Sequence, residues 1–361
     1  MARAEVNRAH AAADTPGPDR APTPALLEVE DLSVFFAVEH GRLLRAVDEV
    51  SFSVGRGEVL GLVGESGCGK TTVAKCIVGQ ITPTTGTLLF EGRKLGSQRR
   101  AEDRRAIQMV FQDPYSSLNP RMSVRQVLRE LLRVHHLVPS SGIERRCREL
   151  MDLVGLPADA LDGLPSQFSG GQRQRIAIAR ALAVEPQVII ADEPVSALDV
   201  SVQATILRLF EDLNSRLGLT IVFISHNLAV VRRLSGRVAV MYLGRIVEEG
   251  DRESVFSDPR HPYTRALLGA APRLHQTELA RPSVKGEPPS PIDIPPGCPF
   301  HPRCPRAEAV CSADRPVLES VQTGAWHLAA CHFRHEAALN AQGAMPLPEP
   351  EETSESAEEA P

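Results

Sequence analysis

Five short and mostly apolar runs are the strongest pattern in this chain of 361 residues. They cover residues 59–63, 107–111, 188–192, 221–225 and 238–243. Apolar runs of this length are typical of strands that are buried on both faces of a parallel sheet. We therefore expect them to form the main sheet of an α/β fold.

Two other regions show different patterns. Residues 27–36 and 47–54 alternate as strands do, and we expect them to form an antiparallel β layer beside the main sheet. Residues 122–184 are largely helical by pattern, within an insert that spans about 115–184. The fold class is therefore α/β, with a central sheet, an antiparallel layer and a helical insert.

A phosphate-binding loop follows directly after the first apolar run. Backbone N–H groups of such a loop close around phosphates at a helix N-terminus, Lys70 adds a positive charge, and the Thr71 hydroxyl can bind Mg2+. A plain glycine-rich turn would leave these two residues unexplained. The candidate ATP-binding residues are Gly64, Glu65, Ser66, Gly67, Cys68, Gly69, Lys70, Thr71 and Thr72.

A pair of carboxylates, Asp192 and Glu193, ends the apolar run that starts at residue 188. Two adjacent carboxylates at the end of a buried strand are costly without a cation. We expect Asp192 to hold Mg2+, and Glu193 to orient or deprotonate the water that attacks the γ-phosphate. The alternative is an acidic turn that only solvates the strand end.

A serine and two glycines open an amphipathic helix between these two sites. Residues 168–172 read Phe-Ser-Gly-Gly-Gln. Together with the phosphate loop and the Asp-Glu strand, this segment resembles the signature motif of ABC-transporter ATPases, with Phe168 in place of the usual leucine. The resemblance implies that Ser169, Gly170, Gly171 and Gln172 contact the ATP held by a second subunit.

The same resemblance covers residues 26–252 and assigns four further residues. Gln112 matches the glutamine that contacts Mg2+ and the attacking water, Asp199 matches the aspartate that reaches across the dimer, and His226 matches the histidine at the γ-phosphate. Phe36 aligns with the aromatic residue that stacks on adenine, although the adjacent Phe35 is an alternative. In this family two subunits sandwich two ATP molecules head to tail, and hydrolysis lets the dimer open.

Residues 258–268 resemble the His-Pro-Tyr segment of oligopeptide and dipeptide transporter ATPases. This resemblance implies a peptide importer, assembled from a second ATPase subunit, two permeases and an extracytoplasmic binding protein. It favours a heterodimer of ATPases on the cytoplasmic face of the membrane. The sequence leaves the cargo open among dipeptides, oligopeptides, nickel and glutathione.

Four of the seven cysteines gather near the C-terminus, at Cys298, Cys304, Cys311 and Cys331. A small extension often needs a cross-link to hold its shape, so a metal centre is favoured. Similar extensions in the subfamily carry a [4Fe-4S] cluster, which implies the same here. The spacing of five, six and nineteen intervening residues is unlike a zinc ribbon, but zinc, free thiols and a disulfide remain alternatives.

Composition limits the other possible functions. The formal charge of −5 and the scattered basic residues give no support for nucleic-acid binding. No apolar stretch approaches the ~18 to 20 residues that cross a bilayer, which suggests a peripheral protein. A soluble ABC ATPase of translation or DNA repair is the alternative function, but it would carry tandem nucleotide domains or long coiled coils.

The predicted organisation has four parts. Residues 1–24 are expected to be disordered, 25–255 to form the nucleotide-binding domain, 256–336 the cysteine-rich extension, and 337–361 an acidic disordered tail.

Overall fold

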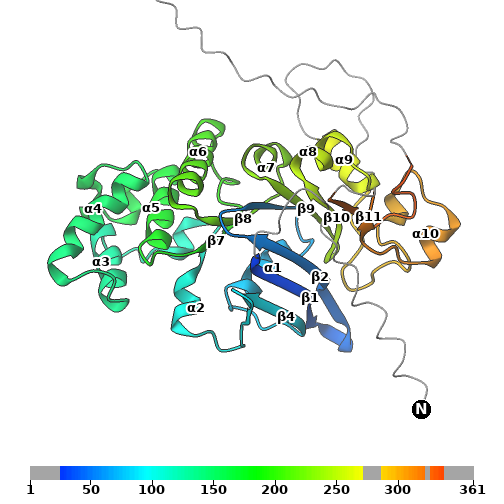
Figure 1. Ribbon diagram of the computed structural model, residues 1–361, viewed down its shortest axis with the longest axis horizontal. Helices are drawn as coiled ribbons and strands as arrows, with labels where there is room; N and C mark the ends of the chain where they lie inside the picture. Colours follow the sequence, from blue (N-terminus) through cyan, green and yellow to red (C-terminus); the bar gives the residue numbers. More distant parts are fainter. Residues whose placement is uncertain (1–24, 271–285, 322–325, 337–361) are drawn as a thin grey trace, which may run out of the picture.

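The structure of the protein, a computed structural model, describes residues 25–270, 286–321 and 326–336 (Figure 1). The predictions of disorder for residues 1–24 and 337–361 fall outside the described residues.

The first sheet is antiparallel and has the strand order β2-β1-β4-β5 within the described residues. Its strands are β1 (Ala25–Ala37), β2 (Leu43–Gly55), β4 (Thr85–Phe90) and β5 (Arg93–Lys94). The two predicted strands lie in β1 and β2, which pair with each other directly. The pair β4 and β5, which the pattern did not predict, extends the layer on the far side of β1.

The main sheet has the order β11-β12-β10-β9-β3-β8-β7-β6 across the described residues. Its strands are β3 (Val59–Val63), β6 (Ile107–Val110), β7 (Val188–Asp192), β8 (Thr220–Ser225), β9 (Arg237–Tyr242), β10 (Arg245–Asp251), β11 (Glu319–Ser320) and β12 (His327–Ala329). The five predicted apolar runs form the parallel part, from β6 to β9. Strand β12 pairs with β10, so the C-terminal extension adds strands to the sheet of the nucleotide domain.

The structure has the following α-helices within the described residues. They are α1 (Lys70–Ile77), α2 (Ala101–Ala106), α3 (Val124–Val134), α4 (Ile143–Leu153), α5 (Gly170–Leu182), α6 (Val200–Leu217), α7 (Leu228–Leu234), α8 (Arg252–Ser257), α9 (Pro262–Ala270) and α10 (Ala309–Ala313). Figure 1 shows α3, α4 and α5 gathered at one end of the molecule, and α10 with the rest of the extension at the other end. The predicted helical insert is thus a lobe beside the main sheet.

Two apolar cores hold these layers together. One core joins the antiparallel sheet, α1 and one face of the main sheet, and includes Leu27, Ile77 and Ile190. The other core joins the opposite face of the main sheet to the helical insert. This second core also contains Tyr263 and Phe300, so the extension packs as a continuation of the domain.

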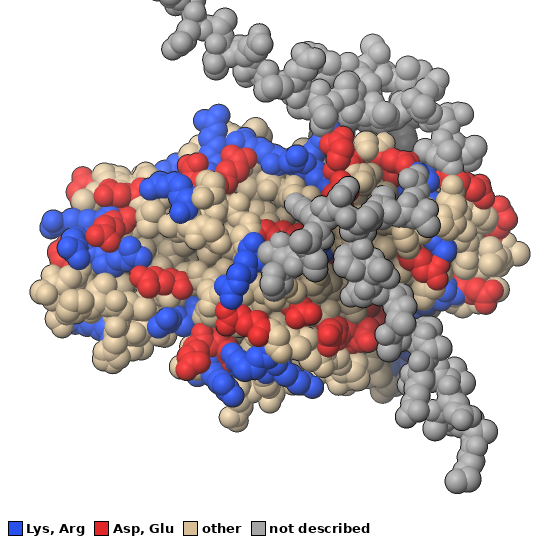
Figure 2. All heavy atoms as spheres, viewed as in Figure 1, with Lys and Arg blue, Asp and Glu red and all other residues tan. Residues whose placement is uncertain are grey.

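The surface carries mixed charge. On the face drawn in Figure 2, basic and acidic side chains of the described residues are interspersed over both the helical insert and the sheets. Among the helices of the described residues, none has the length and apolar character that crossing a bilayer requires.

Candidate nucleotide-binding site

The phosphate loop connects β3 to α1 through backbone shapes that only glycine tolerates. Gly69 has φ +107°, and a Cβ atom there would lie 2.1 Å from the carbonyl oxygen of Ala46. A Cβ atom on Gly64 would lie 2.1 Å from the carbonyl oxygen of Met241. Real Cβ atoms do not approach backbone that closely, so the two glycines let the loop pack against β2 and β9.

Lys70 opens α1 and is buried. Its Nζ donates to the carbonyl oxygens of Gly64 at 2.8 Å and Glu65 at 3.0 Å. The Cys68 sulfur lies 3.8 Å from the same nitrogen. The ammonium group therefore sits inside the curve of the loop, where an anionic phosphate would meet it together with the helix N-terminus.

The Thr71 hydroxyl and the Asp192 carboxylate lie together, with 3.2 Å between their oxygens. Asp192 ends β7 and is only 4% exposed. Burial raises the pKa of this carboxyl, and the Thr71 hydroxyl partly opposes the effect. A hydroxyl and a buried carboxylate in contact are hard oxygen ligands, so the two residues fit Mg2+.

Glu193 and His226 meet at the ends of two neighbouring strands. One oxygen of Glu193 lies 3.0 Å from Nδ1 of His226. Glu193 has a positive φ of 46°, and its N–H donates to the carbonyl oxygen of Ile224 at 3.0 Å. A left-handed backbone is unusual for a residue other than glycine, and it turns the Glu193 carboxylate away from the line of β7.

Gln112 and Phe36 lie at other edges of the region. Strand β6 pairs in parallel with β7, with Val110 opposite Ala191, so Gln112 leaves the sheet at the same end as the two carboxylates. Its side chain is exposed. Phe36 lies near the end of β1 opposite Leu44 and is 40% exposed, so its ring is accessible to a ligand.

The signature residues open α5, where Ser169 caps the helix. Its hydroxyl accepts the N–H of Gln172 at 3.3 Å, and the Gln172 side chain accepts the Ser169 N–H at 2.9 Å. A Cβ atom on Gly171 would lie 2.3 Å from Val202 of α6, the helix that Asp199 precedes. The signature and Asp199 thus adjoin, whereas Figure 1 shows α5 in the helical insert, apart from α1.

The four C-terminal cysteines line one small cavity. All are free, and Cys298, Cys311 and Cys331 are buried. Burial, with a smaller contribution from the other three thiols, raises the pKa of Cys298 to about 11. Within the described residues there is no group of three or more His, Cys, Asp or Glu side chains placed to hold a single metal ion.

Sequence reasoning missed two residues that contact the phosphate loop. The Tyr263 hydroxyl accepts the Glu65 N–H at 2.8 Å. The guanidinium of Arg303 binds both carboxylate oxygens of Glu65, at 2.8 and 3.0 Å. Tyr263 belongs to the His-Pro-Tyr segment, which the sequence identified, but the pattern did not predict that this tyrosine contacts Glu65. Arg303 had no signal beyond its place next to Cys304.

Comparisons with known proteins agree with this geometry. Residues 47–196 match the ABC transporter family, and residues 247–311 match the family described as oligopeptide/dipeptide transporter, C-terminal region. The chain is 44% identical to the oligopeptide transport ATP-binding protein AppF of Bacillus subtilis, over 85% of this chain and 97% of that protein. It is 47% identical to the dipeptide transport ATP-binding protein DppF of Escherichia coli, over 81% and 91%.

Solved structures show the same fold. The protein cbiO1 of Clostridium perfringens, part of the ABC transporter complex cbiONQ, matches with a TM-score of 0.58 at 30% identity, over 64% of this chain and 91% of that chain. The ATP-binding cassette MJ0796, in a dimer bound to ADP and Pi, matches with a TM-score of 0.56 at 27% identity, over 63% and 98%. The chain belongs to the ATP-binding proteins of the ABC transporters, in the branch that carries the oligopeptide/dipeptide transporter C-terminal region.

Proposed function

We propose that this chain is the ATP-hydrolysing subunit of an importer that takes up dipeptides or oligopeptides. The observation that carries the proposal is the pairing of Glu193 with His226, one residue beyond the contact between Thr71 and Asp192. These two pairs lie next to the phosphate loop, at the C-terminal edge of the parallel part of the main sheet, and support the roles of a base for water and an oxygen site for Mg2+. That edge is where open α/β sheets bind ligands.

Each residue has a distinct role in the proposed reaction. The loop and Lys70 hold the β- and γ-phosphates, and Phe36 stacks on adenine. Thr71, Asp192 and Gln112 would hold Mg2+, which supplies charge neutralisation on the phosphates. Glu193 orients and deprotonates the attacking water. His226 fixes the Glu193 carboxylate and contacts the γ-phosphate.

A second subunit completes the site. Ser169, Gly170, Gly171 and Gln172 form a capped helix start that faces no phosphate loop of its own chain, so we infer that it covers ATP held by a partner. Asp199 lies beside it and would reach across the same interface. The solved cassette MJ0796 is described as a dimer. The resemblance to oligopeptide and dipeptide transporter ATPases favours a heterodimer, so we propose a related ATPase as the partner rather than a second copy.

The peptide assignment draws on the relatives and the extension. The most similar proteins described above carry names of oligopeptide and dipeptide transport, and residues 247–311 match a region defined by such transporters. We infer that the chain works with two permeases and an extracytoplasmic binding protein, on the cytoplasmic face of the membrane.

We further propose that Cys298, Cys304, Cys311 and Cys331 hold a [4Fe-4S] cluster, which would supply a covalent cross-link and one-electron redox chemistry. The donor set fits this group. The backbone N–H groups of Phe300, Arg306 and Phe333 lower the pKa values of Cys298, Cys304 and Cys331, against the larger effect of burial. Hydrogen bonds to sulfur stabilise iron-sulfur clusters. The four thiolates that bind such a cluster lie further apart than the four ligands of one zinc ion.

The substitution Glu193→Gln tests the proposed reaction. The variant should bind ATP with Mg2+ as the natural chain does, lose turnover by about 100-fold or more, and favour a closed dimer. A matched control is Glu211→Gln, since Glu211 forms a surface ion pair with Arg233 outside the site. ATP binding is followed by equilibrium dialysis and hydrolysis by phosphate release. Near-normal hydrolysis by the Glu193 variant would refute the assignment of the base.

A further inference from the structure

Glu65, the second residue of the phosphate loop, is held from two directions by the C-terminal extension. Tyr263 accepts its backbone N–H, and Arg303 binds both oxygens of its side chain. The two partners lie 198 and 238 residues further along the chain. Neither contact follows from the local fold of the loop, since the conformation of the loop is explained by its glycines and by the start of α1.

The ion pair between Arg303 and Glu65 is mostly buried and bidentate, two properties that strengthen an ion pair. The Arg303 side chain is 5% exposed and that of Glu65 is 24% exposed, so water screens the pair weakly. Two parallel N–H···O bonds fix the geometry as well as the charge. The Glu65 carboxylate raises the pKa of the guanidinium, as expected of a stable pair.

Tyr263 and Arg303 are both packed against the aromatic residues of the core. The Tyr263 ring is fully buried, with its centroid 4.6 Å from that of Tyr242 in β9 and 5.5 Å from that of Phe300. Nη1 of Arg303 lies 3.4 Å from the Tyr242 hydroxyl. The aromatic cluster of Tyr242, Tyr263 and Phe300 thus joins the main sheet to the residues that grip Glu65.

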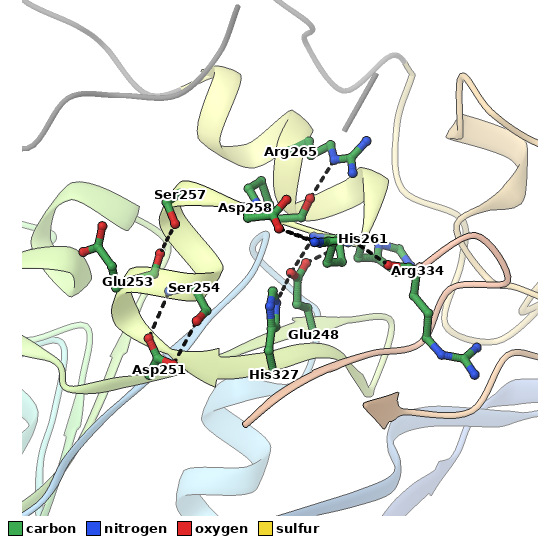
Figure 3. A network of polar contacts seen from close by, with 12 residues as sticks. Glu248, Asp251, Glu253, Ser254, Ser257, Asp258, His261, Arg265, His327 and Arg334 are labelled. Carbon is green, nitrogen blue, oxygen red and sulfur yellow. Dashed lines mark hydrogen bonds and ion pairs between the residues drawn. The ribbon is translucent and has the colours of Figure 1, made fainter. Parts of the chain in front are cut away.

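A buried carboxylate fixes where α9 begins. Glu248 of β10 accepts the N–H groups of Arg260 at 2.7 Å and His261 at 2.9 Å, and lies 2.8 Å from Nε2 of His327 (Figure 3). Nδ1 of His261 in turn accepts the Tyr263 N–H at 3.1 Å. A chain of hydrogen bonds therefore runs from the sheet, through the His-Pro-Tyr segment, to the phosphate loop.

The contacts that fix Glu65 also affect Lys70, the cation of the phosphate loop. The carbonyl oxygen of Glu65 accepts from Nζ of Lys70 at 3.0 Å, and it also accepts the Cys68 N–H at 3.3 Å. One residue thus gives its N–H and carboxylate to the extension and its carbonyl to Lys70. Moving the Glu65 peptide would move both the loop and the ammonium group.

We propose that Arg303 and Tyr263 are positioning residues for ATP: by holding Glu65, the extension sets the shape of the phosphate loop and hence its nucleotide affinity. The inference rests on the proposed ATP site at Lys70. It gives the extension a task in the catalytic cycle that is separate from any metal at its cysteines.

The test is a double-mutant cycle on Arg303 and Glu65 in the full chain. Arg303→Gln and Glu65→Gln should each weaken binding of ATP with Mg2+ by about fivefold or more, measured by titration calorimetry, and should raise KM with little change in kcat. The double variant should bind no worse than the weaker single variant. Arg303→Lys should recover part of the affinity. Arg334→Gln is the matched control, because Arg334 pairs with Glu319 inside the extension.

Each other outcome speaks against the inference. Arg303→Gln with the natural affinity would overturn it, and so would independent, additive effects of the two substitutions. If Arg303→Gln does not fold, Tyr263→Phe removes only the hydroxyl that accepts the Glu65 N–H, and unchanged affinity in that variant would overturn the inference. Failure of the natural chain itself to bind ATP would instead defeat the proposed function.

Discussion

Glu193 and His226 lie 3.0 Å apart although they are 33 positions apart in the sequence, because β7 and β8 are neighbours in the main sheet. If His226 acts by holding the carboxylate that activates water, His226→Ala should lower turnover by about 10- to 100-fold while ATP still binds. Phosphate release at saturating ATP measures the loss.

The combination of His226→Ala with Glu193→Gln checks that the two residues act as one unit. We expect the double variant to be about as slow as Glu193→Gln alone, since positioning a missing carboxylate gains nothing. Multiplied losses in the double variant would mean that the contact of His226 with the γ-phosphate, and not its hold on Glu193, carries most of its effect on turnover.

Gly69→Ala should abolish most nucleotide binding. The added Cβ atom would lie 2.1 Å from the backbone of Ala46, which has to shift and carry the loop with it. Gly92→Ala is the matched control, because Gly92 also has a positive φ, +70°, but no atom within 4 Å of its Cβ position. The control should lose about 1 kcal/mol of stability with unchanged ATP affinity. Equal affinity losses in both variants would contradict this view of the loop.

Glu248→Gln should destabilise the protein markedly. The buried carboxylate accepts from Arg260, His261 and His327, and an amide has one oxygen for these donors. Leaving one buried donor without a partner costs about 1–3 kcal/mol, so the midpoint of chemical denaturation should fall. Glu319→Gln removes an exposed ion pair and should change stability by less than about 1 kcal/mol. A Glu248 variant as stable as the control would show that His327 compensates.

The sequence predicted the parts of the fold that depend on repeated local patterns. The apolar runs 59–63 and 188–192 became β3 and β7, since buried parallel strands need continuous apolar side chains. Short strands such as β12 were missed, because three residues hold too little pattern, and pairing with β10 decides their shape. The contacts of Tyr263 and Arg303 with Glu65 were also missed. They join residues about 200 positions apart, and a local sequence pattern carries no information on such contacts.

The reactivity of a motif residue is harder to predict from the sequence than its place in a loop. A cysteine inside a phosphate loop, as Cys68 is, suggests from the sequence alone that alkylation would inhibit the ATPase. The structure argues against this expectation, since Cys68 is 5% exposed and burial raises the pKa of its thiol. No sequence pattern reveals whether a side chain in a tight loop points inward.

Thiol labelling should therefore spare Cys68. With iodoacetamide at pH 8 and no nucleotide, Cys304 of metal-free chain should react well before Cys68, because Cys304 is partly exposed to the reagent whereas Cys68 is buried. Mass spectrometry of peptides over time measures both rates in one sample. Faster labelling of Cys68 than of Cys304 would mean that the loop opens readily in solution.

Replacing one of the four C-terminal cysteines tests the proposed cluster. Chain purified without oxygen should absorb near ~400 nm and contain about four irons, and Cys304→Ser should lose most of both. Cys147→Ser is the matched control, since Cys147 is a free buried thiol in α4, away from the extension. Because the cysteine cavity borders the loop that carries Arg303, loss of iron should also lower the thermal stability of the Cys304 variant below that of the natural chain. Colourless chain with one bound zinc would favour the mononuclear alternative, and metal-free chain of unchanged stability would leave the thiols with a packing role alone.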